Sequence, residues 1–244
     1  MTHLEPTLGR NRTGSQMSPL MTAAMLESSK DFPWDEMEAS LDTPEKIRMD
    51  YVKDAHTIGS IPVPMTLKGM AKTGYEKVKG EKPEILVDKL GERLAFERTG
   101  VRLYRALIRK CEADPMRDPR VDLLRLQEIC NSELEHMMLL KKAMEDVGAD
   151  PTAMTPGADT MAVASMGLVQ VLNDPRTSIS QCLEAILIAE LADQDGWNLL
   201  IELTRDMGDQ DHLAQFQRAM AEEEQHVIDI RMLLKELTMG KTKL

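Results

Sequence analysis

The residues best suited to chemistry in this sequence are two glutamates that each have a histidine three positions later. They stand in the segments Glu133-Leu-Glu-His136 and Glu223-Glu-Gln-His226. On an α-helix, side chains three positions apart project from the same face, so each pair offers one carboxylate and one imidazole to a common point. Carboxylate oxygens and imidazole nitrogens are suitable ligands for Fe(II) and Mn(II).

Glutamates also interrupt the apolar stripes of four expected helices. In each helix apolar residues recur at alternating steps of three and four, which is typical of a helix buried on one side. One core position of each stripe is a glutamate, and the four are Glu97, Glu133, Glu190 and Glu223. The same register places Glu222 and Glu224 on the flanks of the last stripe. A carboxylate in a core costs several kcal/mol unless it is paired, protonated or bound to a metal.

Four carboxylates that share one core repel one another and lose their hydration. We expect no compensating arginine or lysine in the same stripes. Two divalent cations would balance the charge, with carboxylates bridging them and an imidazole completing each coordination shell. The sequence therefore predicts a two-metal site with the ligands Glu97, Glu133, His136, Glu190, Glu223 and His226.

Four long amphipathic helices must position these ligands. We expect them over Pro83 to Cys111, from Asp118-Pro119 to Val147, from Ser178 to about Gly208, and from Asp209 to Thr238. First-turn prolines, a capping box formed by Ser178 and Gln181, and a stop at Gly148 mark their ends. The long connection over Asp150–Arg176 is expected to contain a short helix over Thr160–Leu172. The pattern predicts an all-α fold, a four-helix bundle with a long crossover between the second and third helices.

Residues 1–80 differ from the rest of the chain. Ser, Thr, Gly and Pro punctuate them, and none of their short helical patches has a long apolar stripe. These patches are Met21–Ser29, Glu45–His56 and Met65–Lys77. We therefore expect an extended or partly helical N-terminal arm over 1–80, followed by the bundle over 81–244.

Bulk composition excludes several classes of protein. With 30 basic and 41 acidic residues, the net charge of −11 argues against nucleic-acid binding. Cys111, Cys130 and Cys182 are isolated, so no C-x-x-C module of the rubredoxin or zinc-ribbon type and no disulfide framework is expected. The sequence shows no signal peptide and no apolar run long enough to cross a bilayer. We expect a soluble, cytoplasmic protein without a membrane partner.

The helical part, roughly Pro83 to Leu237, resembles the ferritin-like superfamily of di-iron carboxylate proteins. Their signature is Glu, Glu-x-x-His, Glu, Glu-x-x-His, with one set on each helix. The chain is most similar to bacterioferritin-type and rubrerythrin-type centres. The resemblance implies that Glu133 and Glu223 bridge the metals, with Glu97 and His136 at one end and Glu190 and His226 at the other.

Three further residues are candidates for a place beside the metals. Tyr104 lies seven residues after Glu97, where bacterioferritin-like proteins carry a tyrosine, and is either a redox participant or a hydrogen-bonded core residue. Asp193 falls near the place of an extra glutamate in rubrerythrins, and is either an additional ligand or a polar neighbour. Asp229 follows His226 by three positions and either orients an imidazole or is a solvated surface residue.

The resemblance implies a di-metal oxidoreductase that contains two iron ions and reacts with O2 or H2O2. Its activity would be that of a ferroxidase, a peroxidase or an oxygenase. A manganese or mixed Fe/Mn centre, and manganese-catalase-like dismutation of H2O2, are close variants. Two alternatives are non-catalytic iron binding or storage, and a scaffold that has lost its chemistry.

Three departures from the family bear on assembly. The chain has an N-terminal arm, lacks the C-x-x-C electron-delivery module of rubrerythrin, and has a tail after Leu237 that is too short for a fifth helix. We therefore expect a homo-oligomer, with a dimer favoured over a 24-subunit cage.

Overall fold

Four long helices carry the apolar stripes. In this computed structural model they are α4 (Pro83–Ala113), α5 (Leu123–Asp146), α8 (Ile179–Asp206) and α9 (Gln210–Lys241). The structure describes residues 18–31, 45–61 and 83–241, and within these ranges it contains helices, turns and irregular segments but no strand. The prediction of an all-α fold is therefore confirmed for the described residues.

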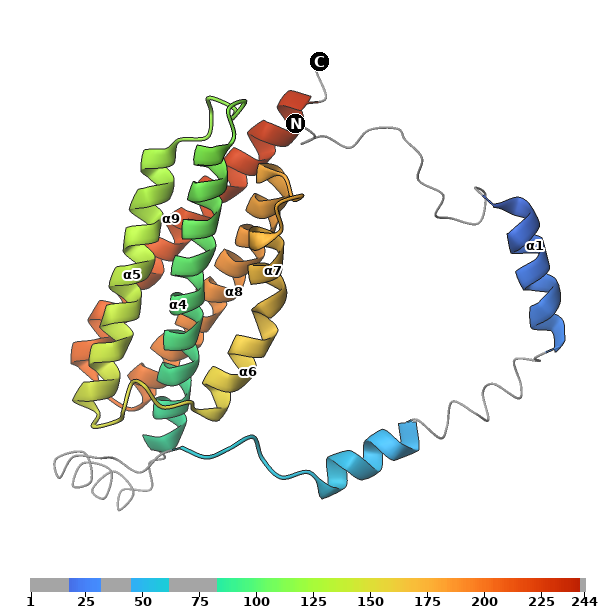
Figure 1. The fold of residues 1–244 in the computed structure, drawn as a ribbon. Coiled ribbons are helices and arrows are strands. Elements are labelled where there is room, and N and C mark those ends of the chain that lie inside the picture. Colours follow the sequence, from blue (N-terminus) through green and yellow to red (C-terminus); the bar gives the residue numbers. More distant parts are fainter. Residues whose placement is uncertain (1–17, 32–44, 62–82, 242–244) are drawn as a thin grey trace. The chain divides into compact units, whose positions relative to one another are not determined.

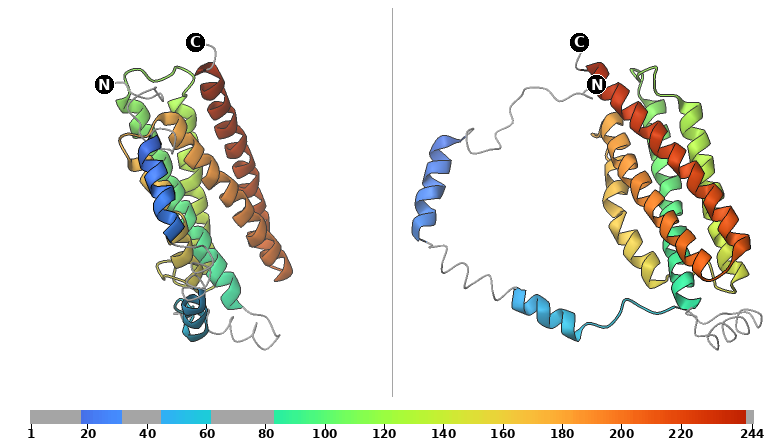
Figure 2. Two further views of the ribbon diagram at one scale, coloured as in Figure 1. Left: turned by 90° about the vertical axis from the view of Figure 1, so that its right-hand side faces the viewer. Right: turned by 180° about the vertical axis from the view of Figure 1, so that it is seen from behind.

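The long helices pack side by side, with α4 against α5 and α8, and α9 against α8 and α5 (Figure 1). Two shorter helices, α6 (Pro156–Ala164) and α7 (Met166–Asn173), connect α5 with α8. They lie against α4, on the side opposite to α5 (Figures 1 and 2). This connection returns the chain to the end at which α5 begins, so α5 and α8 run in the same direction.

The connection contains two helices where the sequence predicted one over Thr160–Leu172. Ser165 separates them, and its hydroxyl donates a hydrogen bond to the carbonyl oxygen of Met161 at 2.8 Å. A serine that bonds to a backbone carbonyl one turn earlier competes with regular helix hydrogen bonding. The break at this serine is consistent with that competition.

Two apolar clusters form the core, one towards each end of the long helices. The first includes Leu107, Cys111, Leu126, Leu183 and Ile230, and the second includes Leu90, Leu140, Met144, Trp197 and Phe216. On every long helix one of the predicted core glutamates lies between residues of the two clusters. The flanking pairs are Leu94 and Val101 on α4, Cys130 and Leu140 on α5, Ala189 and Trp197 on α8, and Met220 and Ile230 on α9.

The ends of the long helices follow local capping. The capping box predicted at the start of α8 is confirmed, because the Ser178 hydroxyl accepts from the Gln181 N–H while the Gln181 side chain accepts from the Ser178 N–H. After α5 and α8, Gly148 and Gly208 have φ values of +83° and +73°. Only glycine adopts this left-handed conformation at little cost, so both helices stop there.

The predicted start of the second long helix, at Asp118-Pro119, is wrong. α5 begins at Leu123, and the Asp122 side chain caps it by accepting from the N–H groups of Leu124 and Arg125. The Asp118 carboxylate accepts from the backbone N–H of Arg120 at 3.0 Å and forms a turn instead. Both aspartates are suitable caps, and only the second is followed by helix.

Residues 18–31 and 45–57 belong to a different unit from residues 58–61 and 83–241. The first unit contains α1 (Pro19–Ser28), the 3-10 turn η2 (Ser29–Asp31) and a helix over 45–54. Two of the three expected helical patches are thus confirmed, while the patch over Met65–Lys77 and the boundary at residue 80 lie outside the described residues. Among the described residues, no helix combines the length and apolar character that crossing a membrane requires.

Candidate metal centre

The six residues predicted as metal ligands lie together between the two apolar clusters. They come from all four long helices, and each is at most 3% exposed. We call them the Glu/His cluster, and its members are Glu97, Glu133, His136, Glu190, Glu223 and His226. Their gathering in one place confirms that the four glutamates interrupt one shared core.

The cluster contains groups of side chains that could hold a metal ion. One consists of Glu133, Glu190, Glu223 and His226, and another of Glu97, His136 and Glu223. Within each group the ligand atoms all lie within 4.8 Å of one another. Glu223 belongs to both groups, so the two ends of the cluster share this carboxylate. Glu133 also lies close to both ends, because it groups with Glu97 as well as with Glu190.

Two carboxylate oxygens of the cluster, Oε2 of Glu97 and Oε2 of Glu190, are buried and have no hydrogen-bond partner among the described residues. Nδ1 of His136 and Oε1 of Glu223 are also buried, and they lie 2.6 Å apart as an ion pair. Buried polar atoms without partners are costly. Because carboxylate oxygens and imidazole nitrogens donate lone pairs to divalent transition metals, this donor set fits metal binding.

Without metal, the carboxylates of the cluster differ in their pKa values. Burial, followed by the negative charge of Glu133, raises the pKa of Glu97 well above its ordinary value. Burial and the charges of Glu133 and Glu223 do the same for Glu190. Burial also opposes ionisation of Glu223, but contacts with the two cluster histidines outweigh it and lower its pKa to about 2. Glu223 is therefore ionised in the metal-free cluster.

The two histidines take up the opposite charge. Burial lowers the pKa of His136, but its contact with Glu223 and the surrounding carboxylates outweigh this and raise the pKa to about 9. The same balance, with contacts to Glu133 and Glu223, raises the pKa of His226 to about 10. Two imidazolium ions thus provide part of the positive charge that the metal-free cluster needs.

Glu222 orients one of these histidines, which the sequence analysis missed. Its Oε2 lies 3.0 Å from Nε2 of His136 and accepts a hydrogen bond from the Ser132 hydroxyl at 3.2 Å. A carboxylate on the outer ring nitrogen fixes the tautomer and leaves Nδ1 facing the cluster. The prediction that Glu222 lies on the flank of the apolar stripe was correct. Its contact with α5 depends on the distance between two helices, which a single-helix pattern does not contain.

Tyr104 lies against the other end of the cluster. Its side chain is 1% exposed, and its hydroxyl donates a hydrogen bond to Oε1 of Glu190. Burial and the negative charge of Glu190 raise the pKa of Tyr104 well above its ordinary value, so the phenol stays neutral. The structure therefore places Tyr104 as a hydrogen-bonded neighbour of Glu190.

A small cavity between α4 and α8 adjoins the cluster. Its walls include Tyr104, Glu133, Glu190 and Asp193 on the polar side, and Phe96, Leu103, Ile186 and Ala189 on the apolar side. Its free volume of about 10 Å³ is close to what one water molecule needs. Any molecule that reaches the carboxylates from this side without rearrangement must therefore be very small.

Arg93 is a buried cation that corrects the expectation of an uncompensated core. It lies one turn before Glu97 on α4 and is 1% exposed. Its Nη2 lies 3.2 Å from Oε1 of Glu97 and forms an ion pair with Asp193 of α8. The stripe pattern missed Arg93 because α4 packs against α5, α6, α7 and α8, so it is buried on more than one face. Asp193 thus lies beside the cluster, paired with Arg93.

Two helical glycines make room for these charged groups. A Cβ atom on Gly100 of α4 would overlap the carboxylate of Glu133, and one on Gly196 of α8 would overlap the guanidinium of Arg93. Glycine within a helix costs about 1 kcal/mol relative to alanine. Two glycines inside strongly periodic helices were therefore a signal in the sequence that a bulky group approaches closely.

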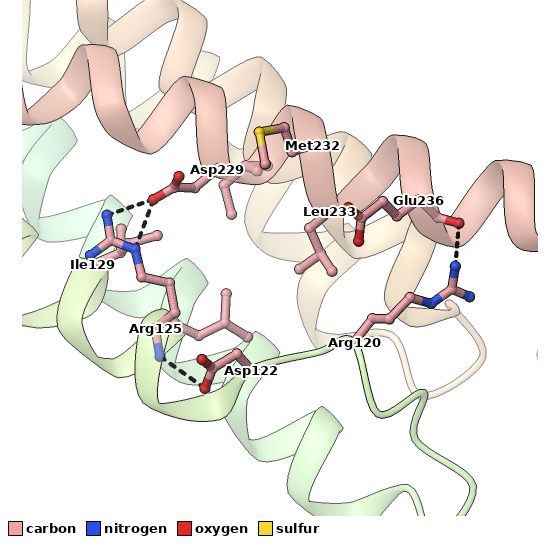
Figure 3. Close-up of a pocket in the computed structure, with 10 residues that line it drawn as sticks. Arg120, Asp122, Arg125, Ile129, Asp229, Met232, Leu233 and Glu236 are labelled. Carbon is pink, nitrogen blue, oxygen red and sulfur yellow. Dashed lines mark hydrogen bonds and ion pairs between the residues drawn. The ribbon is translucent and has the colours of Figure 1, made fainter.

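Asp229 is not directed towards the cluster. Its carboxylate pairs with Arg125 of α5 at 2.5 Å and accepts from Gln225 at 2.7 Å. Asp229 and Arg125 line a groove between α5 and α9, where Arg120 also donates to the carbonyl oxygen of Glu236 (Figure 3). Of the two alternatives for Asp229, the structure supports a polar residue at the surface.

Comparison of the chain with descriptions of known protein families, with curated proteins and with solved structures gives no match. The sequence resemblance to ferritin-like proteins therefore has no support from these comparisons.

The shared position of Glu223 predicts a sharp difference between neighbouring glutamates. Glu223→Ala should remove most bound metal, because this residue belongs to every group of candidate ligands. Glu224→Ala is the matched control, since Glu224 is exposed and should leave metal content unchanged. Metal analysis after anaerobic loading with Mn(II) measures both. Equal losses from the two variants would show that the register of α9 is wrong.

The raised histidine pKa values predict how the metal-free protein responds to pH. A pKa that is higher in the folded than in the unfolded state stabilises the fold below the unfolded value of about 6.5. That stabilisation is lost as the pH rises through about 9 for His136 and about 10 for His226. Thermal melts in the presence of a chelator should therefore show a falling melting temperature between pH 6.5 and 10.

The double variant His136→Gln/His226→Gln is the control for this experiment and should show a much flatter profile. If the metal-free parent melts at the same temperature throughout this range, the histidines do not carry the charge assigned to them.

Proposed function

We propose that this chain is a ferritin-like di-metal oxidoreductase whose four long helices form a bundle around two iron or manganese ions. The observation that carries the proposal is the buried Glu/His cluster, in which two groups of ligand-type side chains share Glu223. Four glutamates and two histidines drawn from four helices, with a Glu-x-x-His pair on two of them, match the ligand pattern of such bundles.

The proposed ligand roles are those that the resemblance to ferritin-like proteins implies for the cluster residues. Glu97 and His136 would hold one ion, Glu190 and His226 the other, and Glu133 and Glu223 would bridge them. The four negative charges of the glutamates equal the positive charge of two divalent ions. When two Fe(II) ions are bound, they supply electrons for the reduction of O2 or H2O2.

The surrounding residues would orient the ligands and control access. Glu222 holds the His136 ring by its outer nitrogen, and Tyr104 holds the Glu190 carboxylate by a hydrogen bond. Both histidines must give up a proton before they bind a metal, which ties metal binding to pH. Apolar residues of α4 and α8 form part of the wall of the small cavity beside Glu190.

The size of this cavity favours O2 or H2O2 as the substrate over an organic molecule. Its free volume of about 10 Å³ is close to that of one water molecule, which leaves no space for an organic substrate. We therefore favour ferroxidase or peroxidase chemistry, with catalase-like dismutation of H2O2 as the variant for a manganese pair. We also propose that the protein is cytoplasmic and forms a homo-oligomer, which is a dimer and not a 24-subunit cage.

Aerobic titration with Fe(II) tests this function. The parent should bind and oxidise about two Fe(II) per chain, in line with the ligand count. The absorbance of the oxidised product and the mass of the assembly are followed together. Rapid oxidation in a small oligomer supports the oxidoreductase, whereas slow accumulation of mineral in a large shell supports iron storage.

Glu133→Ala and Glu135→Ala form the matched pair for this titration. Glu133 is buried in the cluster, while Glu135 is exposed on the same helix. The first variant should lose Fe(II) oxidation and the second should keep it. If the parent binds far less than one Fe(II) per chain, the proposal is wrong.

A further inference from the structure

Asp193 is a carboxylate within reach of the cluster, and with Glu97, Glu133 and Glu223 it forms a third group of possible metal ligands. One of its oxygens lies within 4.8 Å of oxygens of Glu97, Glu133 and Glu223. The residue is 2% exposed and also lines the small cavity beside Glu190. By position alone, Asp193 could therefore become a fifth carboxylate ligand.

Whether the Asp193 carboxylate is free to bind a metal depends on Arg93, which contacts it. The two side chains form an ion pair, and the same guanidinium lies 3.2 Å from Glu97. Arg93 is itself held in place, with its guanidinium carbon 4.8 Å from the centre of the Phe96 ring. The missing side chain of Gly196 provides the space that the guanidinium fills.

The ion pair between Arg93 and Asp193 affects the charge balance of the proposed metal site. Four glutamates neutralise two divalent ions, and Arg93 neutralises Asp193, so the complete site carries no net charge. If Arg93 were neutral, Asp193 would be a buried carboxylate whose nearest positive charges are the metals. At separations of a few ångströms in a buried site, that attraction is strong.

We propose that Arg93 is a positioning residue that keeps Asp193 out of the metal coordination shell and so fixes the number of carboxylate ligands at four. This inference rests on the proposed two-metal site and deepens it, because it identifies what sets the charge and affinity of that site. Asp193 contacts Arg93 in place of a metal, and removal of the arginine charge recruits it.

The test compares Co(II) binding to the parent with binding to Arg93→Gln and to Arg93→Gln/Asp193→Asn. The visible absorption spectrum of bound Co(II) reports its ligands, and equilibrium dialysis against a chelator gives its affinity. In Arg93→Gln the spectrum should change and the affinity should rise by about tenfold or more, because a fifth carboxylate faces the metals. In the double variant, spectrum and affinity should return towards the parent values.

Two controls separate charge from packing. Arg98→Gln removes an exposed arginine from the same helix and should leave both readouts unchanged. Arg93→Lys keeps the positive charge and should preserve the parent spectrum. If Arg93→Gln does not fold, the double variant decides, since it leaves neither partner charged. A parent-like spectrum supports the proposal and a different one overturns it.

The outcomes distinguish this inference from the function on which it rests. If the parent binds no Co(II), the two-metal site itself is wrong. If the parent binds Co(II) in the cluster but its spectrum differs from that of the double variant, Asp193 is already a ligand. If Arg93→Gln gives the parent spectrum, Asp193 is not recruited, and the positioning role of Arg93 is refuted.

Discussion

Mutual repulsion among buried carboxylates is the constraint on which the rest of this structure depends. Four glutamates in one core, joined by Asp193, would prevent folding if all were ionised and unpaired. The metal-free chain meets this constraint in three ways. Burial favours the protonated forms of Glu97 and Glu190, the two cluster histidines carry positive charge, and Arg93 pairs with Asp193. If two divalent metal ions were bound, their charge would balance the four glutamates. Protonated glutamates and charged histidines would then no longer be needed.

The apolar residues on either side of the cluster hold the charged groups in place. Each long helix contributes to both apolar clusters, so each ligand-type side chain is anchored above and below by packing. Packing at native density leaves little freedom for the helices to move apart and relieve the repulsion. The glycines at 100 and 196 make space for charged side chains between the helices. Each lowers the stability of its own helix, because glycine is a weaker helix former than alanine.

Patterns within single helices predicted much of this fold, and contacts between helices account for what they missed. A period of three and four residues identifies the buried face of a helix, so the long helices and the gathering of all six cluster residues could be inferred. It does not show how many faces are buried, which is why Arg93 on the crowded helix α4 was missed. The pattern also does not show which polar residues of two helices contact each other, as Glu222 and His136 do. The start of α5 at Leu123 was misjudged because two aspartates compete as its cap.

The central claim is that the Glu/His cluster binds a pair of metal ions, and the location of those ions tests it most directly. Crystals of the chain loaded anaerobically with Mn(II) or Fe(II) would be measured on both sides of the metal absorption edge. The account predicts about two anomalous peaks per chain, one near Glu97 and His136 and one near Glu190 and His226, with Glu223 between them. Peaks confined to the protein surface, with none in the cluster, would contradict it.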